Sequence, residues 1–170
     1  DISDLYEAGL KKDYVYGQKF WDDEYRLNAL IANYPKPYVA FMQGFTMGGG
    51  VGISCHGSHR IVCDTSKIAM PECSIGLVPD VGGSFLLSQV PGNLGYYLGL
   101  TSTQLNAADA IFAGFADYYI PKEEWLTVTE FLEQSGDLSV LQKSSKNPGE
   151  SQLAANKDFF DKAFKFKNLS

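Results

Sequence analysis

Two carboxylates, Glu72 and Asp80, stand eight residues apart in the segment MPECSIGLVPDVGG, and each directly follows a proline. The stretch between them, 75–78, is apolar, and we expect the fold to cover its side chains. Such cover would carry both acids into a medium of low dielectric constant and raise their pKa values. A carboxyl group tuned in this way can act as a general base or acid near neutral pH. The residues also allow plain structural roles, in which Glu72 caps a turn and Asp80 is the N-cap of a helix beginning at Val81.

A run of glycines at 46–52, TMGGGVG, comes ahead of these acids. The first N–H groups of a helix have no partner inside it, so a glycine turn that leads into a helix presents donors and a partial positive charge to an anion. No Gly-Lys-Ser/Thr follows the run, as a P-loop requires, and the third glycine of G-x-G-x-x-G is missing. The run therefore indicates a donor pocket for a small developing charge, such as the oxygen of an ester or thioester. Close packing of a helix on a strand, which also demands small residues, is the alternative.

A third acid lies on the apolar side of a predicted helix. Helical periodicity over 13–34 places Phe20, Leu27 and Ile31 on one stripe. Glu24 is four residues after Phe20 and three before Leu27, so its side chain points along the centre of that stripe. The residues leave two interpretations open: the carboxylate reaches water at the edge of the core, or it faces something that needs an acid.

The elements that position these residues are short, and glycines and prolines separate them. Pro35 and Pro37 end the first helix, since the residue before a proline is pushed out of the α region. Uncharged strands on either side of a short helix predict a right-handed, parallel β-α-β unit in an α/β fold. The predicted strands are YVAFMQ, HRIVCDT, 67–70 and ADYYIP, and the predicted helices are VGISCHG, 84–89, 94–100, 107–113, 122–133 and 152–167.

Composition divides the chain into a core over 1–133, a linker or loop excursion over 134–150, and a C-terminal helix within 151–170. The middle segment is rich in Ser, Gly, Asn and Lys, which is typical of a connection. The last helix contains a cluster of basic residues that we expect to be a solvated face rather than a binding surface. Its members are Lys157, Lys162, Lys165 and Lys167.

Charge and composition argue against nucleic acid and membrane as partners. The net charge is −6 and only two arginines occur, whereas a surface that follows phosphates needs clustered Lys and Arg. Residues 37–59 contain no charged side chain, but the glycines in this run leave too little apolar surface for a membrane span.

The cysteines and histidines do not predict a metal centre or a thiol nucleophile. The spacing of Cys55, His56, His59 and Cys63 matches no common zinc pattern. Cys55 and His56 are adjacent, so a helix would point their side chains in different directions, and no G-x-S-x-G motif occurs. Three cysteines are an odd number, which fits a reducing compartment better than a disulfide framework.

Two segments together resemble a known family. KPYVAFMQGFTMGGGVGISCHGSHRIV and AMPECSIGLVPDVGGSFLL, with EYRLN and LGYYLGLT, are similar to the crotonase superfamily of acyl-CoA enzymes, which share a ββα spiral core. Within it the chain resembles the 3-hydroxyisobutyryl-CoA hydrolases, from Asp1 to about Trp125. The resemblance implies hydrolysis of a short-chain 3-hydroxyacyl-CoA thioester in valine breakdown. Coenzyme A would be part of the substrate, with no separate cofactor and no metal.

The resemblance also implies a role for each candidate residue. Enoyl-CoA hydratases place one of two catalytic glutamates at the position of Gly52, so that glutamate is absent here. The N–H of Gly49 would hold the thioester oxygen, and Glu72 would act as nucleophile or as base for the attacking water. Asp80 would bind the 3-hydroxyl of the substrate and assist proton transfer, while Glu24 would face the acyl pocket. Two nearby acids titrate as a pair, so the division of roles between Glu72 and Asp80 stays open.

The ends of the chain depart from the family pattern. Asp1 matches the last residue of an Ala-Gly-Gly-Asp segment that supplies the second oxyanion donor, and the C-terminal helices are shortened. We therefore expect an incomplete core and a 170-residue chain with weak or no activity on its own, unless a complementing chain or another copy in a homo-oligomer supplies the rest. A non-catalytic crotonase-fold subunit and an enoyl-CoA isomerase or hydratase are the alternative functions. The expected location is the cytoplasm in a bacterium or the mitochondrial matrix in a eukaryote.

Overall fold

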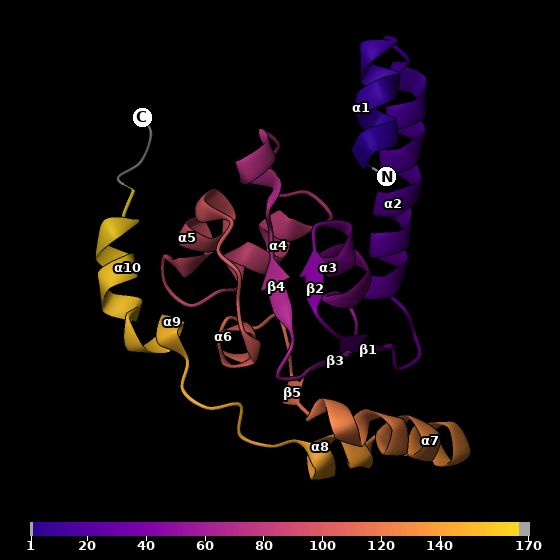
Figure 1. Ribbon diagram of the computed structural model, residues 1–170, viewed down its shortest axis with the longest axis vertical. Coiled ribbons are helices and arrows are strands. Elements are labelled where there is room, and N and C mark those ends of the chain that lie inside the picture. The colour runs from indigo at the N-terminus through magenta and orange to yellow at the C-terminus, as the bar shows by residue number, and fades with distance from the viewer. Residues whose placement is uncertain (1, 167–170) are drawn as a thin grey trace.

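A computed structural model of the chain describes residues 2–166 (Figure 1). Two small parallel sheets organise it. The first has the order β1-β3-β5 and pairs Val39 with His59, and the second joins β2 to β4 and pairs Phe45 with Lys67. The strands are β1 (Val39–Met42), β2 (Phe45–Met47), β3 (His59–Val62), β4 (Lys67–Ala69) and β5 (Tyr118–Tyr119).

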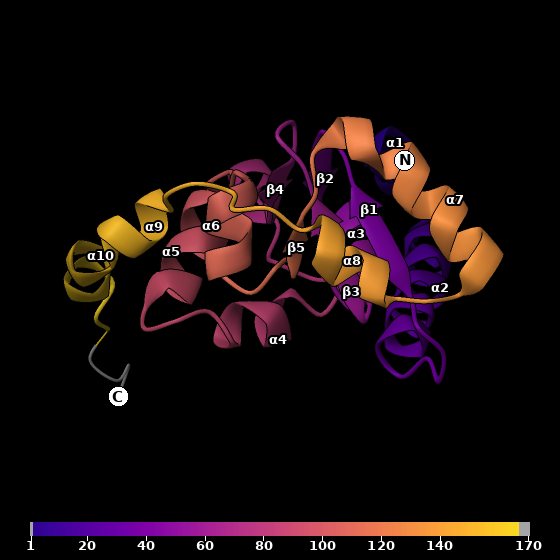
Figure 2. The same cartoon turned by 90° about the horizontal axis from the view of Figure 1, so that it is seen from below.

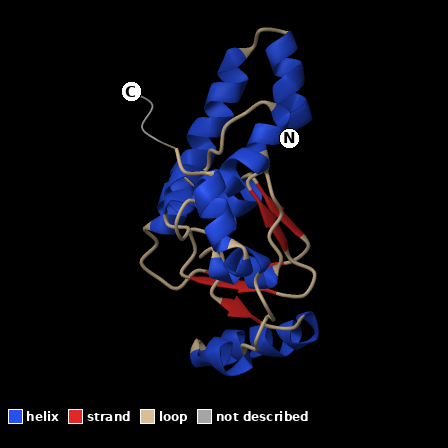
Figure 3. Ribbon diagram, turned by 90° about the vertical axis from the view of Figure 1, so that its left-hand side faces the viewer, coloured by secondary structure: helices blue, strands red, loops and turns tan. Residues whose placement is uncertain are grey.

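The chain visits the two sheets alternately. It runs through β1 and β2, then through the short helix α3 (Gly49–Ser54), and then through β3 and β4, so that each turn adds one strand to each sheet. Figure 3 shows the two sheets running in different directions, with helices around them. This repeat of two strands and a helix is the spiral expected from the sequence, and the predicted parallel pairing around α3 is confirmed.

The predicted strand YVAFMQ is found as β1, whereas β2, which lies just before the glycine run, was not predicted. Gly44 takes a φ of +59°, which glycine adopts without steric cost, and the chain turns there from β1 into β2. The other predicted strands are confirmed with shorter bounds. Their inward side chains build the larger of two apolar clusters, in which Met42, Val62 and Ile68 are at most 2% exposed.

The N-terminal part is a helical hairpin of α1 (Ile2–Leu10) and α2 (Tyr14–Ala32), which extends beyond the sheets in Figure 1. The side chain of Asp13 caps α2 by accepting a hydrogen bond from the N–H of Tyr16. The predicted helix is confirmed, but the predicted stripe is partly wrong, because Leu27 is 45% exposed. The residues of α2 that are buried are Gly17, Asn28 and Ile31.

Short helices cover the larger apolar cluster, and three predicted helices are found there. They follow the predicted positions within one residue at each end. The helices are α4 (Gly83–Ser88), α5 (Leu94–Thr101) and α6 (Ala107–Phe112), and the 3₁₀ helix η1 (Glu72–Ile75) lies in the segment expected to be a loop.

A second apolar cluster joins β3 and the segment after β5 to α7 and α8, two helices labelled in Figure 2. The segment 134–150, expected to be a connection, contains a helix whose Leu141 is fully buried against this cluster. The predicted final helix is broken at Asn156, and Asp1 and Lys167 lie outside the described residues. The elements are η2 (Lys122–Glu124), α7 (Trp125–Ser135), α8 (Ser139–Ser144), α9 (Gln152–Ala155) and α10 (Lys157–Ala163).

Within residues 2–166, no helix is both long and apolar enough to cross a membrane. The same residues contain no group of three or more His, Cys, Asp or Glu side chains placed to hold a metal ion.

Candidate active site

The glycine run forms a tight turn between β2 and α3. Gly48 has φ +51° and ψ −118°, a conformation open to glycine and strained for other residues. Its carbonyl oxygen accepts the N–H groups of Val51 and Gly52 at 2.8 and 3.1 Å. Gly49 is the first residue of α3, so its N–H has no partner within the helix. The turn therefore presents an amide donor at the place the sequence predicts.

Glu72 lies directly beneath this turn. It is the first residue of η1, just after β4 and Pro71, and it is only 5% exposed. A Cβ added to Gly48 would stand 3.1 Å from Glu72 Oε1. Glycine is therefore needed at this position for a second reason besides its backbone conformation, because a side chain would crowd the acid. Glu72 Oε2 is buried and has no hydrogen-bond partner within the described chain. An unsatisfied buried carboxylate oxygen is costly and calls for a functional explanation.

The electrostatics of Glu72 follow from this burial. Burial raises the pKa of the Glu72 carboxyl, the negative charge of Asp80 raises it further, and a hydrogen bond from the backbone N–H of Glu72 itself opposes them. No ion pair among the described residues includes Glu72, Asp80 or Glu24. The acid is thus a stronger base than an exposed glutamate.

Glu24 reaches the same turn from the opposite side. It is half-buried on α2, and a Cβ added to Gly49 would stand 2.7 Å from Glu24 Oε1. Burial and, to a smaller extent, the charge of Asp80 raise the pKa of the Glu24 carboxyl. Of the two interpretations open for Glu24, the structure favours the second, because this acid on the apolar side of α2 faces the glycine turn.

Asp80 lies in the loop between η1 and α4, half-buried, and its Oδ2 accepts a hydrogen bond of 2.9 Å from the Tyr25 hydroxyl. Burial, this hydrogen bond and the charges of Asp80 and Glu24 raise the pKa of Tyr25 to about 12. The Tyr25 hydroxyl therefore keeps its proton and acts as the donor. Because the charge of Asp80 raises the pKa of both Glu24 and Glu72, the three acids form one electrostatic group, two members of which adjoin the glycine turn.

The prediction that the fold buries the apolar side chains between the two acids is wrong. Ile75, Leu77 and Val78 are 59%, 46% and 73% exposed. Glu72 is nevertheless buried, because it follows β4 and lies under the glycine turn.

Three residues around the site were not predicted as functional. Asn28 is 5% exposed, and both polar atoms of its side chain lack a hydrogen-bond partner among the described residues. Its position four residues after Glu24, on the same face of α2, was the only available signal. Tyr25 is adjacent to Glu24 in sequence but contacts Asp80, 55 residues away. His56 was considered only as a metal ligand and as a partner of Cys55.

Gly52 has no room for a side chain. A Cβ at this position would stand 2.8 Å from both Asn28 Oδ1 and Val81 Cβ. A glutamate at position 52 would therefore collide with α2 and with the residue that follows Asp80. The close packing of α2 on α3 therefore explains why glycine, rather than the hydratase glutamate, occupies position 52.

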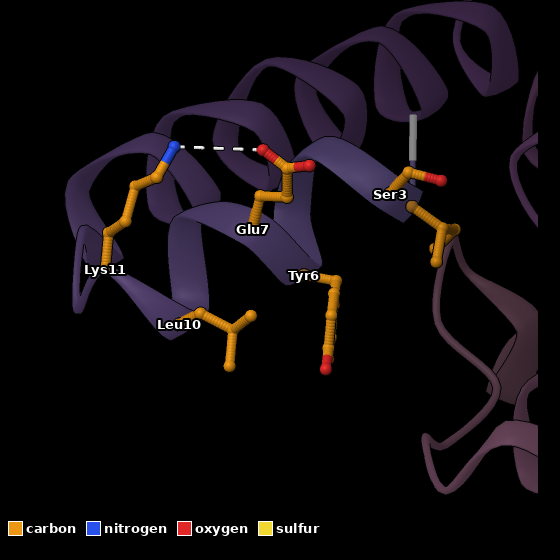
Figure 4. Close-up of a pocket in the computed structure, with 6 residues that line it drawn as sticks. Ser3, Tyr6, Glu7, Leu10 and Lys11 are labelled. Carbon is orange, nitrogen blue, oxygen red and sulfur yellow. Dashed lines mark ion pairs between the residues drawn. The ribbon is translucent and has the colours of Figure 1, made fainter.

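Two hollows adjoin the segment that contains Asp80, and a third lies apart from it. A small one of 190 Å³ is lined by Tyr25, Asp80 and the following residues to Ser84, and a larger one of 730 Å³ lies between the 73–79 segment, α4 and α5. A third, of 530 Å³, lies along α1, where Glu7 and Lys11 form an exposed ion pair of 3.7 Å beside Tyr6 and Leu10 (Figure 4). Gly49, Glu72 and Asp80 do not line this third hollow.

Comparison with known families decides the identity of this fold. A model described as "Enoyl-CoA hydratase/isomerase" matches residues 1–170, the whole chain. The chain belongs to the enoyl-CoA hydratase/isomerase family. The α/β spiral and the resemblance to the crotonase superfamily are thereby confirmed.

Relatives within the enoyl-CoA hydratase/isomerase family carry different names. The mitochondrial 3-hydroxyisobutyryl-CoA hydrolase of Xenopus tropicalis is 46% identical over 124 residues, which are 73% of this chain and 32% of that protein. The small ribosomal subunit protein mS47 of Neurospora crassa is 49% identical over 112 residues, 66% of this chain and 21% of that protein. An enzyme and a ribosomal protein are thus similar to this chain to a comparable degree.

The fold is found in solved members of the family. An enoyl-CoA hydratase from Rhodobacter sphaeroides superposes with a TM-score of 0.92 at 50% identity, covering 96% of this chain and 48% of that one. The chain spans about half of that solved structure and about a third of the Xenopus relative. The comparisons establish the family and the fold, and the reaction is a matter for proposal.

Proposed function

We propose that this chain provides the catalytic centre of an acyl-CoA thioester hydrolase that acts on a short-chain 3-hydroxyacyl-CoA such as 3-hydroxyisobutyryl-CoA, as in valine breakdown. The observation that carries the proposal is Glu72, a buried carboxylate with an unpartnered oxygen directly beneath the glycine turn that presents the N–H of Gly49. Its raised pKa suits it to take up a proton near neutral pH. The resemblance to named hydrolases over most of the chain supports the same reaction.

In the proposed reaction Glu72 acts on an attacking water. It takes a proton from the water while the water oxygen forms a bond to the thioester carbon, and the carbonyl electron pair moves onto the oxygen. The N–H of Gly49 stabilises that oxyanion. The pair then returns, the C–S bond breaks, and the proton held by Glu72 passes to the departing thiolate to give free coenzyme A thiol. Direct attack by Glu72 on the thioester carbon uses the same placement: the C–S bond breaks as the acyl-glutamate anhydride forms, the thiolate takes a proton from water, and water then cleaves the anhydride to release the acid and restore Glu72.

Asp80 and Glu24 would handle the acyl part of the substrate. Asp80 accepts a hydrogen bond from the 3-hydroxyl and assists the proton transfers, and Glu24 borders the acyl pocket. The charge of Asp80 raises the pKa of Glu72. Asp80 would thus both bind the 3-hydroxyl of the substrate and strengthen Glu72 as a base. No cofactor or metal enters these steps, and coenzyme A is part of the substrate.

The packing at Gly52 favours hydrolysis over hydration. Hydration of an enoyl-CoA in this family uses two glutamates, and position 52 has no space for the first while Asn28 and Val81 lie where they do. An isomerase needs a single acid and is the remaining enzymatic alternative.

A non-catalytic subunit of a larger assembly is the second candidate, and the similarity to a ribosomal protein favours it. Against it stands the group formed by Glu24, Glu72 and Asp80, since three neighbouring acids without a cation destabilise a fold and bring a scaffold no advantage. The proposed location is the mitochondrial matrix if the source is a eukaryote, as the name of the Xenopus relative suggests, and the cytoplasm if it is a bacterium.

Product analysis of the complete natural protein tests these proposals. The protein is given 3-hydroxyisobutyryl-CoA, a 2-enoyl-CoA and a 3-enoyl-CoA in separate reactions, and free thiol and acyl-CoA products are measured. The hydrolase predicts thiol release from the first substrate and little change in the other two. Hydration of the 2-enoyl-CoA would identify a hydratase instead of a hydrolase, and isomerisation of the 3-enoyl-CoA would identify an isomerase. No turnover of any of the three substrates would favour the non-catalytic subunit.

A further inference from the structure

The backbone immediately after Asp80 is strained. Val81 has a φ of +46°, in the left-handed region that β-branched residues rarely enter, and it is 1% exposed. Among the described residues, two others that are not glycine have positive φ, Lys12 and Ser102, and neither is β-branched. A strained backbone of this kind persists only where its surroundings determine it, and it concentrates at functional sites.

His56 contacts the backbone at Val81. The ring Nε2 of His56 lies 2.8 Å from the carbonyl oxygen of Val81. A carbonyl oxygen can only accept, so Nε2 carries the proton and donates it. A Cβ at Gly82 would stand 2.6 Å from the same Nε2, which shows how closely the imidazole lies against the loop. The Val81 side chain is fixed as well, because its Cβ lies against Gly52 of α3.

Tyr25 holds Asp80 by its side chain. The Tyr25 hydroxyl donates to Asp80 Oδ2 at 2.9 Å, from a helix that reaches the site independently of the loop. The loop itself offers little support, since the residues from Ser74 to Val78 are exposed. The carbonyl oxygen of Asp80 also accepts the N–H of Gly83, which closes a local turn. From outside the loop, Tyr25 contacts the carboxylate of Asp80 and His56 contacts the backbone that follows it.

We propose that Tyr25 and His56 are positioning residues that hold Asp80 from two sides, Tyr25 through its hydroxyl and His56 through the carbonyl of Val81. This inference rests on the proposed function, in which Asp80 contacts the substrate. A carboxylate on an exposed loop can bind a 3-hydroxyl only if it is held within a fraction of an ångström, and misplacement by 1 Å costs about 100-fold in rate. The strain at Val81 is the consequence of fixing that position.

The kinetic test uses the complete natural protein and 3-hydroxyisobutyryl-CoA. His56→Leu removes the donor and keeps the bulk, His56→Gln keeps an amide donor, and Tyr25→Phe removes only the hydroxyl. We expect Tyr25→Phe and His56→Leu to lower kcat by about 10- to 100-fold with a smaller change in KM, and His56→Gln to recover most of the loss. The controls are His59→Leu and Tyr34→Phe, which lie outside this contact group.

A double-mutant comparison separates positioning from general support of the fold. In an Asp80→Asn background, Tyr25→Phe and His56→Leu should cause little further loss of kcat, because both act through Asp80. If each lowers kcat by the same factor with and without Asp80, or if each lowers only the melting temperature, the inference is overturned.

A crystal structure of the His56→Leu variant tests the inference without any substrate. We expect Val81 to leave the left-handed region and Asp80 to move away from Tyr25. If the natural protein hydrolyses no thioester but the variant shows this change, the proposed function fails and the two-sided hold on Asp80 stands. If Val81 and Asp80 keep their conformations in the variant, the inference is wrong whatever the activity.

Discussion

Glu72 and Asp80 are eight residues apart, and the protein positions them in two different ways. Glu72 is placed by the backbone, since β4 and Pro71 lead directly into it and the glycine turn covers it. Asp80 lies on an exposed loop and is placed by side chains that come from α2 and from the residues after α3. The placement of Glu72 should therefore be sensitive to substitutions in the glycine turn that covers it. The placement of Asp80 should be sensitive to substitutions at residues far from it in the sequence.

Among substitutions at residues around the two acids, the largest effect should come from the turn above Glu72. Gly48→Ala would require a strained backbone and would bring a methyl group to within 3.1 Å of Glu72 Oε1. We expect a loss of about 100- to 1,000-fold in thioester hydrolysis, because the amide donors and the acid are both displaced. Steady-state kinetics with thiol detection measures this.

Gly50 offers a matched control for the turn. It follows Gly49 in α3, and the nearest atom to an added Cβ is 3.7 Å away, an ordinary contact. Gly50→Ala should leave activity within a few-fold of the natural protein. Equal losses at both positions would show that the turn tolerates no substitution at all and that the approach to Glu72 is not the cause.

The next effect concerns the space at Gly52. Gly52→Glu would restore the hydratase pattern in sequence, but its Cβ would overlap Asn28 and Val81. We expect a destabilisation of about 1–3 kcal/mol and no gain of 2-enoyl-CoA hydration. Urea unfolding and a hydration assay measure both. A stable variant with hydratase activity would contradict the steric account.

The pH dependence should distinguish Glu72 from an exposed acid. Because folding raises the pKa of Glu72, the folded chain binds the proton more tightly than the unfolded chain. The free energy of unfolding therefore falls as the pH rises from the unfolded value, about 4.3, through the raised folded value.

Glu72→Gln removes this penalty. The variant should be more stable than the natural protein at pH 7 and should lose that advantage below pH 4, as measured by unfolding across pH. The hydrolysis rate should fall on the acid side with an apparent pKa above that of an ordinary glutamate. A Glu72→Gln variant less stable than the natural protein at pH 7 would contradict the burial of an unpaired charge.

The smallest effect should come from the exposed loop. Val78→Ser replaces a side chain that is 73% exposed, so we expect a change in stability within about 0.5 kcal/mol and nearly unchanged kcat. A large loss of activity would mean that the loop itself, rather than Tyr25 and His56, controls Asp80.

The parts of the site that could be predicted are those set by local chain geometry. The glycines of the turn, the acids after prolines and the place of Glu24 on α2 follow from spacing along the chain. The contacts of Tyr25 with Asp80 and of His56 with Val81 cross 55 and 25 residues, and no local pattern encodes them. The same holds for the fold: most strands and helices were predicted, but α1, the strand β2 after the turn at Gly44, and α8 with its buried Leu141 were not.

The central claim, that Glu72 performs the chemistry, is tested most directly by kcat for thiol release from 3-hydroxyisobutyryl-CoA in the complete natural protein and in Glu72→Gln. A positioned general base contributes about 100- to 10,000-fold. We predict a loss in that range for Glu72→Gln and an unchanged rate for Glu133→Gln, an exposed glutamate on α7. Equal thiol release by the natural protein and Glu72→Gln would contradict the account.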